Sequence, residues 1–117
     1  MRILAVEDDA LILMSTAEIL EDLGHFVLRA TNGRDALAIL ATEDVEVLLT
    51  DVGLRGMSGV ELALEAVRQR PQLAVIFATG RTVMDTQADH ELARAVLLRK
   101  PFSDASLAAA IQASKRL

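Results

Sequence analysis

Three acidic side chains and one lysine, from segments far apart in the chain, have the types and positions that suit chemistry. Glu7 and Asp8 follow the first apolar segment, and Asp51 follows a later one. Lys100 follows a third. If these segments form neighbouring parallel strands, their carboxyl ends share one crevice. Like charges in contact repel by on the order of 4 kcal/mol per pair, against a whole-domain stability of roughly 5–15 kcal/mol. The cluster therefore predicts that a cation binds there.

Strand-like and helix-like patterns alternate along the sequence, and these elements must position the four side chains. Apolar segments typical of strands lie at residues 2–6, 25–30, 45–50, 73–78 and 95–98. Helical patterns lie at residues 10–23, 34–41, between Gly59 and Arg70, around 83–92, and after Ser103 or Asp104.

This alternation predicts an α/β fold with a parallel sheet and right-handed crossovers. The segment 73–78 is nearly all apolar, as expected of a strand covered on both faces by helices. We predict a single doubly wound, flavodoxin-like domain over residues 1–117, with five parallel strands in the order 2-1-3-4-5 and helices on both faces. In that order the first and third strands are neighbours, so Glu7, Asp8 and Asp51 stand together at the switch in strand order.

The composition of the 117-residue chain excludes several classes of function. A net charge of −5 argues against a nucleic-acid surface, which is normally basic. Three Phe, no Trp and no Tyr leave little to stack on a base or a flavin ring. No apolar run reaches the roughly 18 residues of a membrane span, and the start is unlike a secretory signal. We therefore expect a cytoplasmic protein that contacts neither nucleic acid nor membrane.

Taken together, these residues resemble the receiver domain of bacterial response regulators, the phosphorylatable module of two-component signalling. The resemblance runs from Met1 to about Ala113. Its dispersed motif consists of Val6-Glu7-Asp8, Asp51, Gly59, Thr79 and Lys100-Pro101-Phe102, in the family's order. It implies a phosphoprotein that carries an aspartyl phosphate in a phosphorelay. It also implies that the chain is not an enzyme on other substrates and catalyses only its own phosphorylation and dephosphorylation.

The resemblance assigns a magnesium site to the acidic cluster. Asp8 matches the direct ligand, Glu7 the acidic neighbour that holds the metal through water, and the Gly53 carbonyl the backbone ligand. Asp51 completes the set. The chemistry of the residues agrees, because carboxylate and carbonyl oxygens with retained waters are what Mg²⁺ selects.

The resemblance also assigns the reacting groups. Asp51 is the phosphoacceptor, Thr79 the switch hydroxyl, and Lys100 the partner of the phosphoryl oxygens. The peptide bond between Lys100 and Pro101 should be cis. Asp9 falls outside the acidic pair of the family, and we interpret it as the start of the first helix, where a carboxylate favours the positive end of the helix dipole.

The implied phosphoryl donor is a histidine kinase or a histidine phosphotransfer protein. Receivers of this type dock a phosphotransfer helix at the early part of the helix 10–23, together with Pro101 and Phe102. We expect Ile12 on this helix to lie in the core, so an exposed Ile12 would be informative.

The implied output is a downstream protein target. The signal is expected to leave through the Thr79 loop and the face formed by the helix around 83–92, the strand 95–98 and the last helix. A second copy of the chain, forming a homodimer, is a candidate partner for the same face.

Two positions depart from the usual family pattern. Leu97 replaces the aromatic residue that most receivers couple to the switch hydroxyl, and Arg55 replaces a common proline. Gly53 and Arg81 stand where side chains tune dephosphorylation, and because Gly53 cannot hold an attacking water we expect a long-lived phosphoryl group. Phe77-Ala78-Thr79-Gly80 partly resembles the FATGUY subgroup of single-domain receivers.

Three alternative functions differ in how well they suit the residues. A phosphatase of the haloacid-dehalogenase type needs a second aspartate two residues after the first, where this chain has Gly53. A flavin mononucleotide carrier would share the fold, but the acidic crevice and the missing Trp and Tyr count against it. A pseudo-receiver, acting only as a protein-interaction module without phosphorylation, stays open because of Leu97.

Overall fold

The computed structural model describes residues 1–80, 92 and 94–115. Its five strands are β1 (Arg2–Val6), β2 (Phe26–Ala30), β3 (Val47–Asp51), β4 (Ala74–Thr79) and β5 (Val96–Arg99). Four helices lie within the described residues: α1 (Ala10–Asp22), α2 (Gly33–Thr42), α3 (Gly59–Gln69) and α4 (Asp104–Ser114). Within the described residues the expected elements are therefore present, with ends that differ by one or a few residues. The helix expected around 83–92 falls outside the described residues, apart from Leu92, which is buried.

All strand pairs are parallel, and the order β2-β1-β3-β4-β5 confirms the predicted topology. The register explains how distant residues meet. Val6 pairs with Thr50, so Glu7 and Asp51, which come next in the two segments, lie at the same level at the end of the sheet. Asp51 in turn pairs with Ala78 on β4. The carboxyl ends of the central strands thus form one edge.

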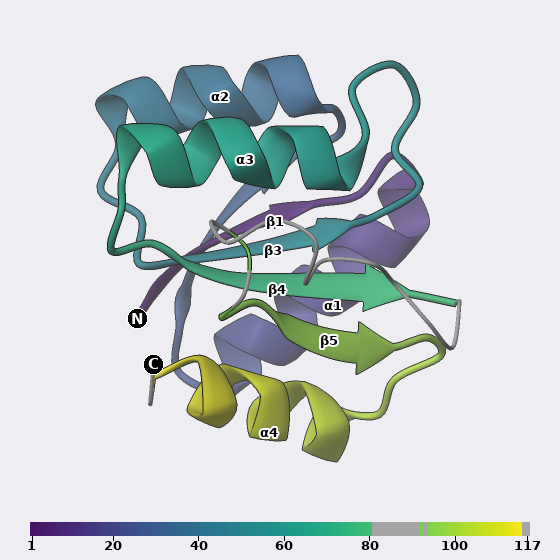
Figure 1. The fold of residues 1–117 in the computed structure, drawn as a ribbon. Helices are drawn as coiled ribbons and strands as arrows, with labels where there is room; N and C mark the ends of the chain where they lie inside the picture. Colours follow the sequence, from purple (N-terminus) through teal and green to yellow (C-terminus); the bar gives the residue numbers. More distant parts are fainter. Residues whose placement is uncertain (81–91, 93, 116–117) are drawn as a thin grey trace.

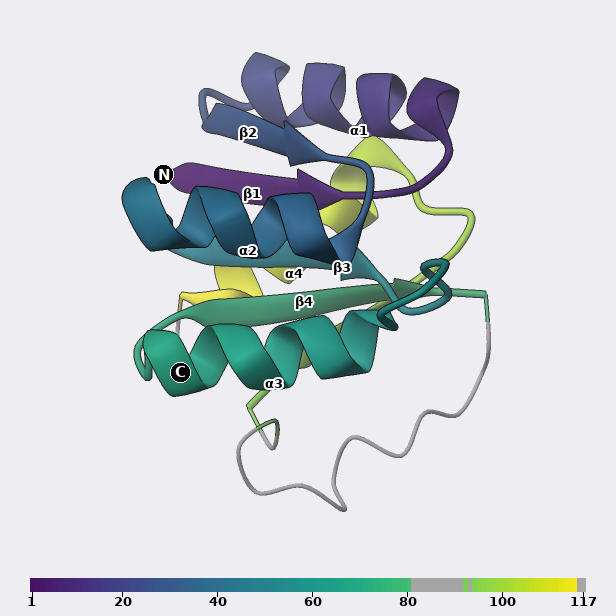
Figure 2. The ribbon, with the colours of Figure 1, turned by 90° about the horizontal axis from the view of Figure 1, so that it is seen from above.

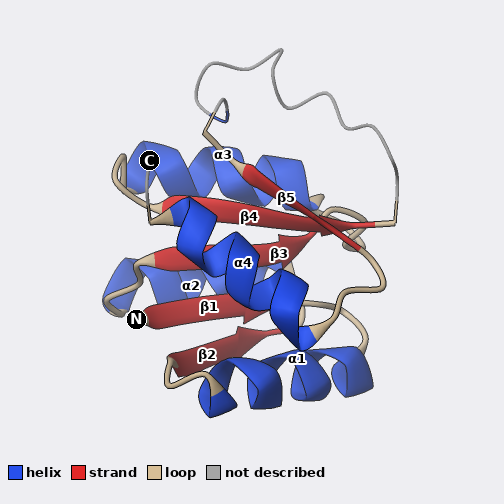
Figure 3. Cartoon of the chain, turned by 90° about the horizontal axis from the view of Figure 1, so that it is seen from below, coloured by secondary structure: helices blue, strands red, loops and turns tan. Residues whose placement is uncertain are grey.

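Helices cover the sheet in two layers. Figure 1 shows α2 and α3 on one side of the strands and α1 and α4 on the other. Figure 2 looks onto the first layer and Figure 3 onto the second. Successive strand side chains point to opposite faces: Leu4 packs in the cluster with α2 and α3, and Ile3 packs in the cluster with α1 and α4.

The first helix begins as the sequence predicts. Asp9 is the N-cap of α1, and its Oδ1 accepts hydrogen bonds from the backbone N–H groups of Leu11 and Ile12. The carboxylate therefore satisfies two of the donors left unpaired at a helix start. Gly24, just after the helix, has a φ of 94°, a left-handed conformation that suits glycine.

The expectation that Ile12 lies in the core is wrong. The buried residues of α1 are Leu13, Thr16, Ala17 and Leu20. Ile12 precedes this stripe by one position, which turns its side chain away from the sheet and leaves it 43% exposed. Helix α4 agrees with its apolar spacing, since Leu107 and Ile111 are buried. Among the described residues no helix combines the length and the apolar character that crossing a bilayer requires.

Candidate functional site

The three predicted acids meet at the carboxyl edge of the sheet. Glu7 and Asp8 follow β1, and Asp51 ends β3. One carboxylate oxygen from each of them lies within 4.8 Å of the other two. Glu7 is buried, with 6% of its surface exposed, whereas Asp8 and Asp51 are partly exposed. The structure therefore brings Asp51 next to two acids that lie more than 40 residues earlier in the sequence.

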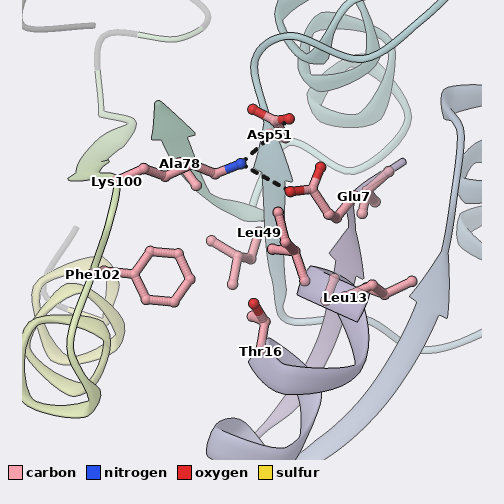
Figure 4. Close-up of a pocket in the computed structure, with 11 residues that line it drawn as sticks. Glu7, Leu13, Thr16, Leu49, Asp51, Ala78, Lys100 and Phe102 are labelled. Atoms are coloured by element: carbon pink, nitrogen blue, oxygen red, sulfur yellow. Dashed lines mark hydrogen bonds and ion pairs between the residues drawn. The ribbon is translucent and has the colours of Figure 1, made fainter. Parts of the chain in front are cut away.

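Lys100 lies across this cluster, as Figure 4 shows. Its Nζ is 2.9 Å from Oε1 of Glu7 and 3.4 Å from Oδ2 of Asp51. The backbone N–H of Lys100 donates to the carbonyl of Thr79 at 2.8 Å, which ties the end of β5 to the end of β4. The following peptide bond, to Pro101, is cis, and this confirms the expectation from the sequence.

The loop after β3 closes over the acids. The backbone N–H of Gly53 donates to Oδ1 of Asp51 at 3.3 Å. Arg55 contacts Asp8 twice, through its backbone N–H at 3.3 Å and its Nε at 3.8 Å, both to Oδ2. Sequence reasoning missed this second pair. The only signal for it was a basic residue at a loop position close to the acids, and the conformation of the loop decides where such a side chain lies.

Gly59 allows α3 to begin directly against Asp51. A Cβ at Gly59 would stand 2.1 Å from the carbonyl oxygen of Asp51 and 2.9 Å from the Cα of Val52. The backbone N–H of Gly59 also donates to the Val52 carbonyl at 3.0 Å. The place of Asp51 therefore depends on a residue without a side chain eight positions later.

The electrostatics of the site show an excess of negative charge. Burial raises the pKa of Glu7 above its ordinary value of 4.5, more than the hydrogen bond from Lys100 lowers it. Burial alone would lower the pKa of Lys100, yet its bonds to Glu7 and Asp51 raise it overall. Glu7 therefore holds its proton more tightly mainly because it is buried, and Lys100 because it contacts two carboxylates. Three carboxylates contacted by one lysine and one arginine leave a net negative charge, which favours an additional cation.

An apolar floor lies under these charges and explains the burial of Glu7. Figure 4 shows Leu13, Leu49 and Phe102 beneath the contact between Glu7 and Lys100, with Ala78 beside the Lys100 side chain. The cavity between them is about 20 Å³, room for one water molecule. Water is therefore largely excluded from the inner side of the cluster.

The remaining predicted positions are placed as follows. Thr79 ends β4 and is 5% exposed. Leu97, which stands for the usual aromatic, is 47% exposed on β5. Arg81 lies outside the described residues. A groove beside the site is lined by Ile12, Ser15, Thr16, Ile19, Lys100, Pro101 and Phe102.

The fold and this site define a class of protein. Residues 3–112 match the family model of the response regulator receiver domain, and the chain belongs to that family. It is therefore a receiver domain of two-component response regulators, which are phosphoryl-accepting signalling modules. Membership of this family decides against the phosphatase and the flavin carrier.

Two curated relatives illustrate the family. The response regulator receiver protein CpdR of Brucella abortus (strain 2308) is 36% identical over 102 residues, which are 86% of this chain and 85% of that protein. The transcriptional regulatory protein CpxR of Escherichia coli (strain K12) is 36% identical over 116 residues, which are 98% of this chain but 49% of CpxR. The chain thus spans most of one relative and about half the length of the other.

Solved structures agree with the fold. A response regulator receiver domain protein from Clostridium thermocellum is 32% identical, with a TM-score of 0.86, over 98% of this chain and 94% of that one. The chemotaxis protein CheY4 of Vibrio cholerae is 27% identical, with a TM-score of 0.87, over 95% of each chain. The fold described above is thus that of receiver domains.

Proposed function

We propose that Asp51 accepts a phosphoryl group from a phosphohistidine, on a histidine kinase or a histidine phosphotransfer protein, and that the phosphorylated chain regulates a protein target. The observation that carries this proposal is the placement of Lys100, whose Nζ lies between Glu7 and Asp51 while Asp8 stands within 4.8 Å of both acids. A receiver that acts on itself in this way is not an enzyme on a separate substrate.

The residues present fit a magnesium ion. Glu7, Asp8 and Asp51 supply three carboxylates with oxygens within 4.8 Å of one another, Glu7 and Asp51 raise the pKa of Lys100, and the Gly53 carbonyl is a fourth oxygen in the loop after β3. Oxygen ligands of this kind suit Mg²⁺. When bound, the ion would neutralise charge on the acids and on the phosphoryl oxygens.

The phosphoryl transfer assigned to Asp51 is a substitution at phosphorus. An Oδ atom of Asp51 bonds to phosphorus as the phosphorus–nitrogen bond of the donor breaks, and the electron pair of that bond leaves with the imidazole. The product is an acyl phosphate on Asp51. Lys100, already beside Asp51, pairs with a phosphoryl oxygen as a mobile point charge. The acyl phosphate carries roughly two negative charges where the Asp51 carboxylate carried one, and this change is the signal. The Thr79 hydroxyl is the proposed group that responds to it.

The groove beside α1 supports the proposed donor. Leu11, Ile12 and Met14 on the first half of α1 are 73%, 43% and 45% exposed. Such apolar exposure favours the docking of a partner helix, and the groove continues to Lys100 and Phe102, next to Asp51. A donor helix that lies there would bring its phosphohistidine to the phosphoacceptor. The partner on the output side, a homodimer included, stays a proposal.

Incubation with acetyl phosphate and MgCl₂, followed by intact-mass measurement, tests the proposal. The wild-type chain should gain the mass of one phosphoryl group, and Asp51→Asn should gain none. Asp44→Asn is the matched control, because Asp44 is an exposed acid that pairs with Arg70 and lies outside the cluster. Phosphoryl uptake by Asp51→Asn would show that the assignment is wrong. A wild-type chain that takes up nothing, and binds no beryllofluoride, would favour the pseudo-receiver.

A further inference from the structure

Within the described residues, two cations contact the acidic cluster, and each contacts different acids. Lys100 contacts Glu7 and Asp51. Arg55 contacts Asp8, and both of its contacts, from the backbone N–H and from Nε, converge on one oxygen, Oδ2. Asp8 thus has a positive partner supplied by the chain itself.

We propose that Arg55 is a displaceable internal cation that competes with the divalent cation for Asp8. This inference rests on the proposed function, because it takes Asp8 as a metal ligand. Arg55 is a competitor rather than a ligand, since a guanidinium carries only donors and repels a metal ion.

The geometry makes Arg55 the cation that leaves. Its side chain is 95% exposed and its Nε stands 3.8 Å from Asp8, so water screens the pair and makes it weak. The side chain of Lys100 is 25% exposed, and its Nζ stands 2.9 Å from a Glu7 side chain that is 8% exposed. The ion pair between Lys100 and Glu7 has the shorter distance and the less exposed side chains, so we expect it to persist when a metal ion binds.

The Arg55 side chain should therefore weaken metal binding. A metal ion at Asp8 has to displace the guanidinium, and the displaced charge stays near the ion because the backbone of residue 55 is held on the same carboxylate. Removing the side chain removes the competitor and the repulsion, while the backbone N–H remains. An Arg55→Lys variant keeps the charge and should keep most of the effect.

Titration with Mn²⁺ at low ionic strength, with free Mn²⁺ measured by electron paramagnetic resonance, tests this competition. Mn²⁺ accepts the same oxygen ligands as Mg²⁺, and the method needs neither Trp nor Tyr, which the chain lacks. Arg55→Ala should bind Mn²⁺ about 3- to 10-fold more tightly than wild type, as expected for loss of a nearby like charge. Arg55→Lys should stay within about twofold of wild type. The difference in Mn²⁺ affinity between wild type and Arg55→Ala should become smaller as NaCl is added, because salt screens the charge.

Arg68→Ala is the matched control. It removes the same charge from an exposed arginine in the last turn of α3, where Arg68 pairs with Glu65. The proposal is overturned if Arg55→Ala binds Mn²⁺ no more tightly than wild type, or if Arg68→Ala shows the same gain.

A further variant, Asp8→Asn, separates this proposal from the proposed function. If wild type binds Mn²⁺, Asp8→Asn loses the binding and Arg55→Ala is unchanged, only the competition is refuted. If Asp8→Asn binds as wild type does, or wild type does not bind at all, the metal site itself is refuted, and the competition with it.

Discussion

Lys100 illustrates how single residues hold the site. Its ammonium lies between two carboxylates, and the side chains of Lys100, Glu7 and Asp51 are 25%, 8% and 17% exposed. Removing one partner of a shielded ion pair leaves the remaining charge without compensation. The fold then loses more stability than the intact pair contributed. In this chain, removal of the Lys100 ammonium would leave both Glu7 and Asp51 without this partner. Arg55 and Asp8 form the contrasting case, a pair that solvent screens.

Replacing Lys100 with methionine should destabilise the domain when divalent cations are absent. We expect a loss of about 1–3 kcal/mol in the free energy of unfolding, the scale of charged hydrogen bonds, and partial recovery when MgCl₂ neutralises the acids. Urea unfolding followed by far-ultraviolet circular dichroism, in EDTA and in MgCl₂, measures both effects. Lys115→Met, which removes an exposed lysine just after α4, is the control. An unchanged urea midpoint for Lys100→Met in EDTA would contradict the prediction.

At the scale of elements, the connection from β3 to α3 decides where Asp51 stands. Ser58 caps α3, with its Oγ accepting from the Glu61 backbone N–H at 3.2 Å, while Glu61 accepts from the Ser58 N–H. This reciprocal capping box fixes the first turn of the helix. The first turn then lies against the Asp51 carbonyl through Gly59. The positions of the helix start and of Asp51 are therefore coupled.

Gly59→Ala should separate these two elements. The new Cβ would overlap the Asp51 carbonyl oxygen at 2.1 Å, and because backbone atoms must give way we expect a loss of about 1–3 kcal/mol in stability. Amide chemical shifts of Asp51, Val52 and Gly53 should change, and phosphoryl uptake from acetyl phosphate should fall. Gly53→Ala is the control, since a Cβ there meets nothing within 4 Å. If the two variants unfold at the same urea concentration, the close approach of Gly59 to Asp51 does not contribute to stability, and the prediction is wrong.

At the scale of the whole molecule, charge is distributed unevenly between the two ends of the sheet. Acids gather where the central strands end. Where they begin, Arg2 pairs with Glu43, and Arg70 pairs with Asp44 and donates to the carbonyls of Leu40 and Glu43. Arg70 follows α3, so these hydrogen bonds join the end of α3 to the end of α2. One end of the sheet is thus neutralised by its own arginines, and the other favours an additional cation.

The pH dependence of global stability should include a contribution from His25. Its Nδ1 lies 3.2 Å from the terminal amino group. Burial, and then the charges of that amino group and Lys115, lower the pKa of His25 below its ordinary 6.5. The unfolded chain therefore binds a proton first as the pH falls, and the stability associated with neutral His25 is lost from about pH 6.5 downward. Above that pH it is fully present.

His25→Asn isolates this contribution. The difference in unfolding free energy between wild type and variant should shrink as the pH is lowered from about 7 to about 5, because only wild type gains the unfavourable proton. Urea denaturation at several pH values, followed by circular dichroism, gives this difference. A difference that stays constant, or widens toward low pH, would mean that His25 titrates normally or with a raised pKa.

The features that depend on local pattern were predictable from the amino-acid order. Alternating strand and helix patterns, with an apolar segment ending at Val6 and another at Thr50, determined a parallel sheet, and the handedness of crossovers limited its strand order. Since parallel strands end at one edge, the meeting of Glu7, Asp8 and Asp51 followed from topology, and the cis bond at Pro101 followed from the family resemblance. The long-lived phosphoryl group and the FATGUY subgroup stay predictions.

Only the tertiary structure decided the features that depend on the rotation of a helix or the path of a loop. Ile12 and Leu13 are both apolar, and the docking angle of α1 on the sheet turned one outward and the other inward. Arg55 reached Asp8 because the loop between β3 and α3 folds back over the end of β1. Residues distant in sequence set such arrangements jointly through packing, and no local pattern records them.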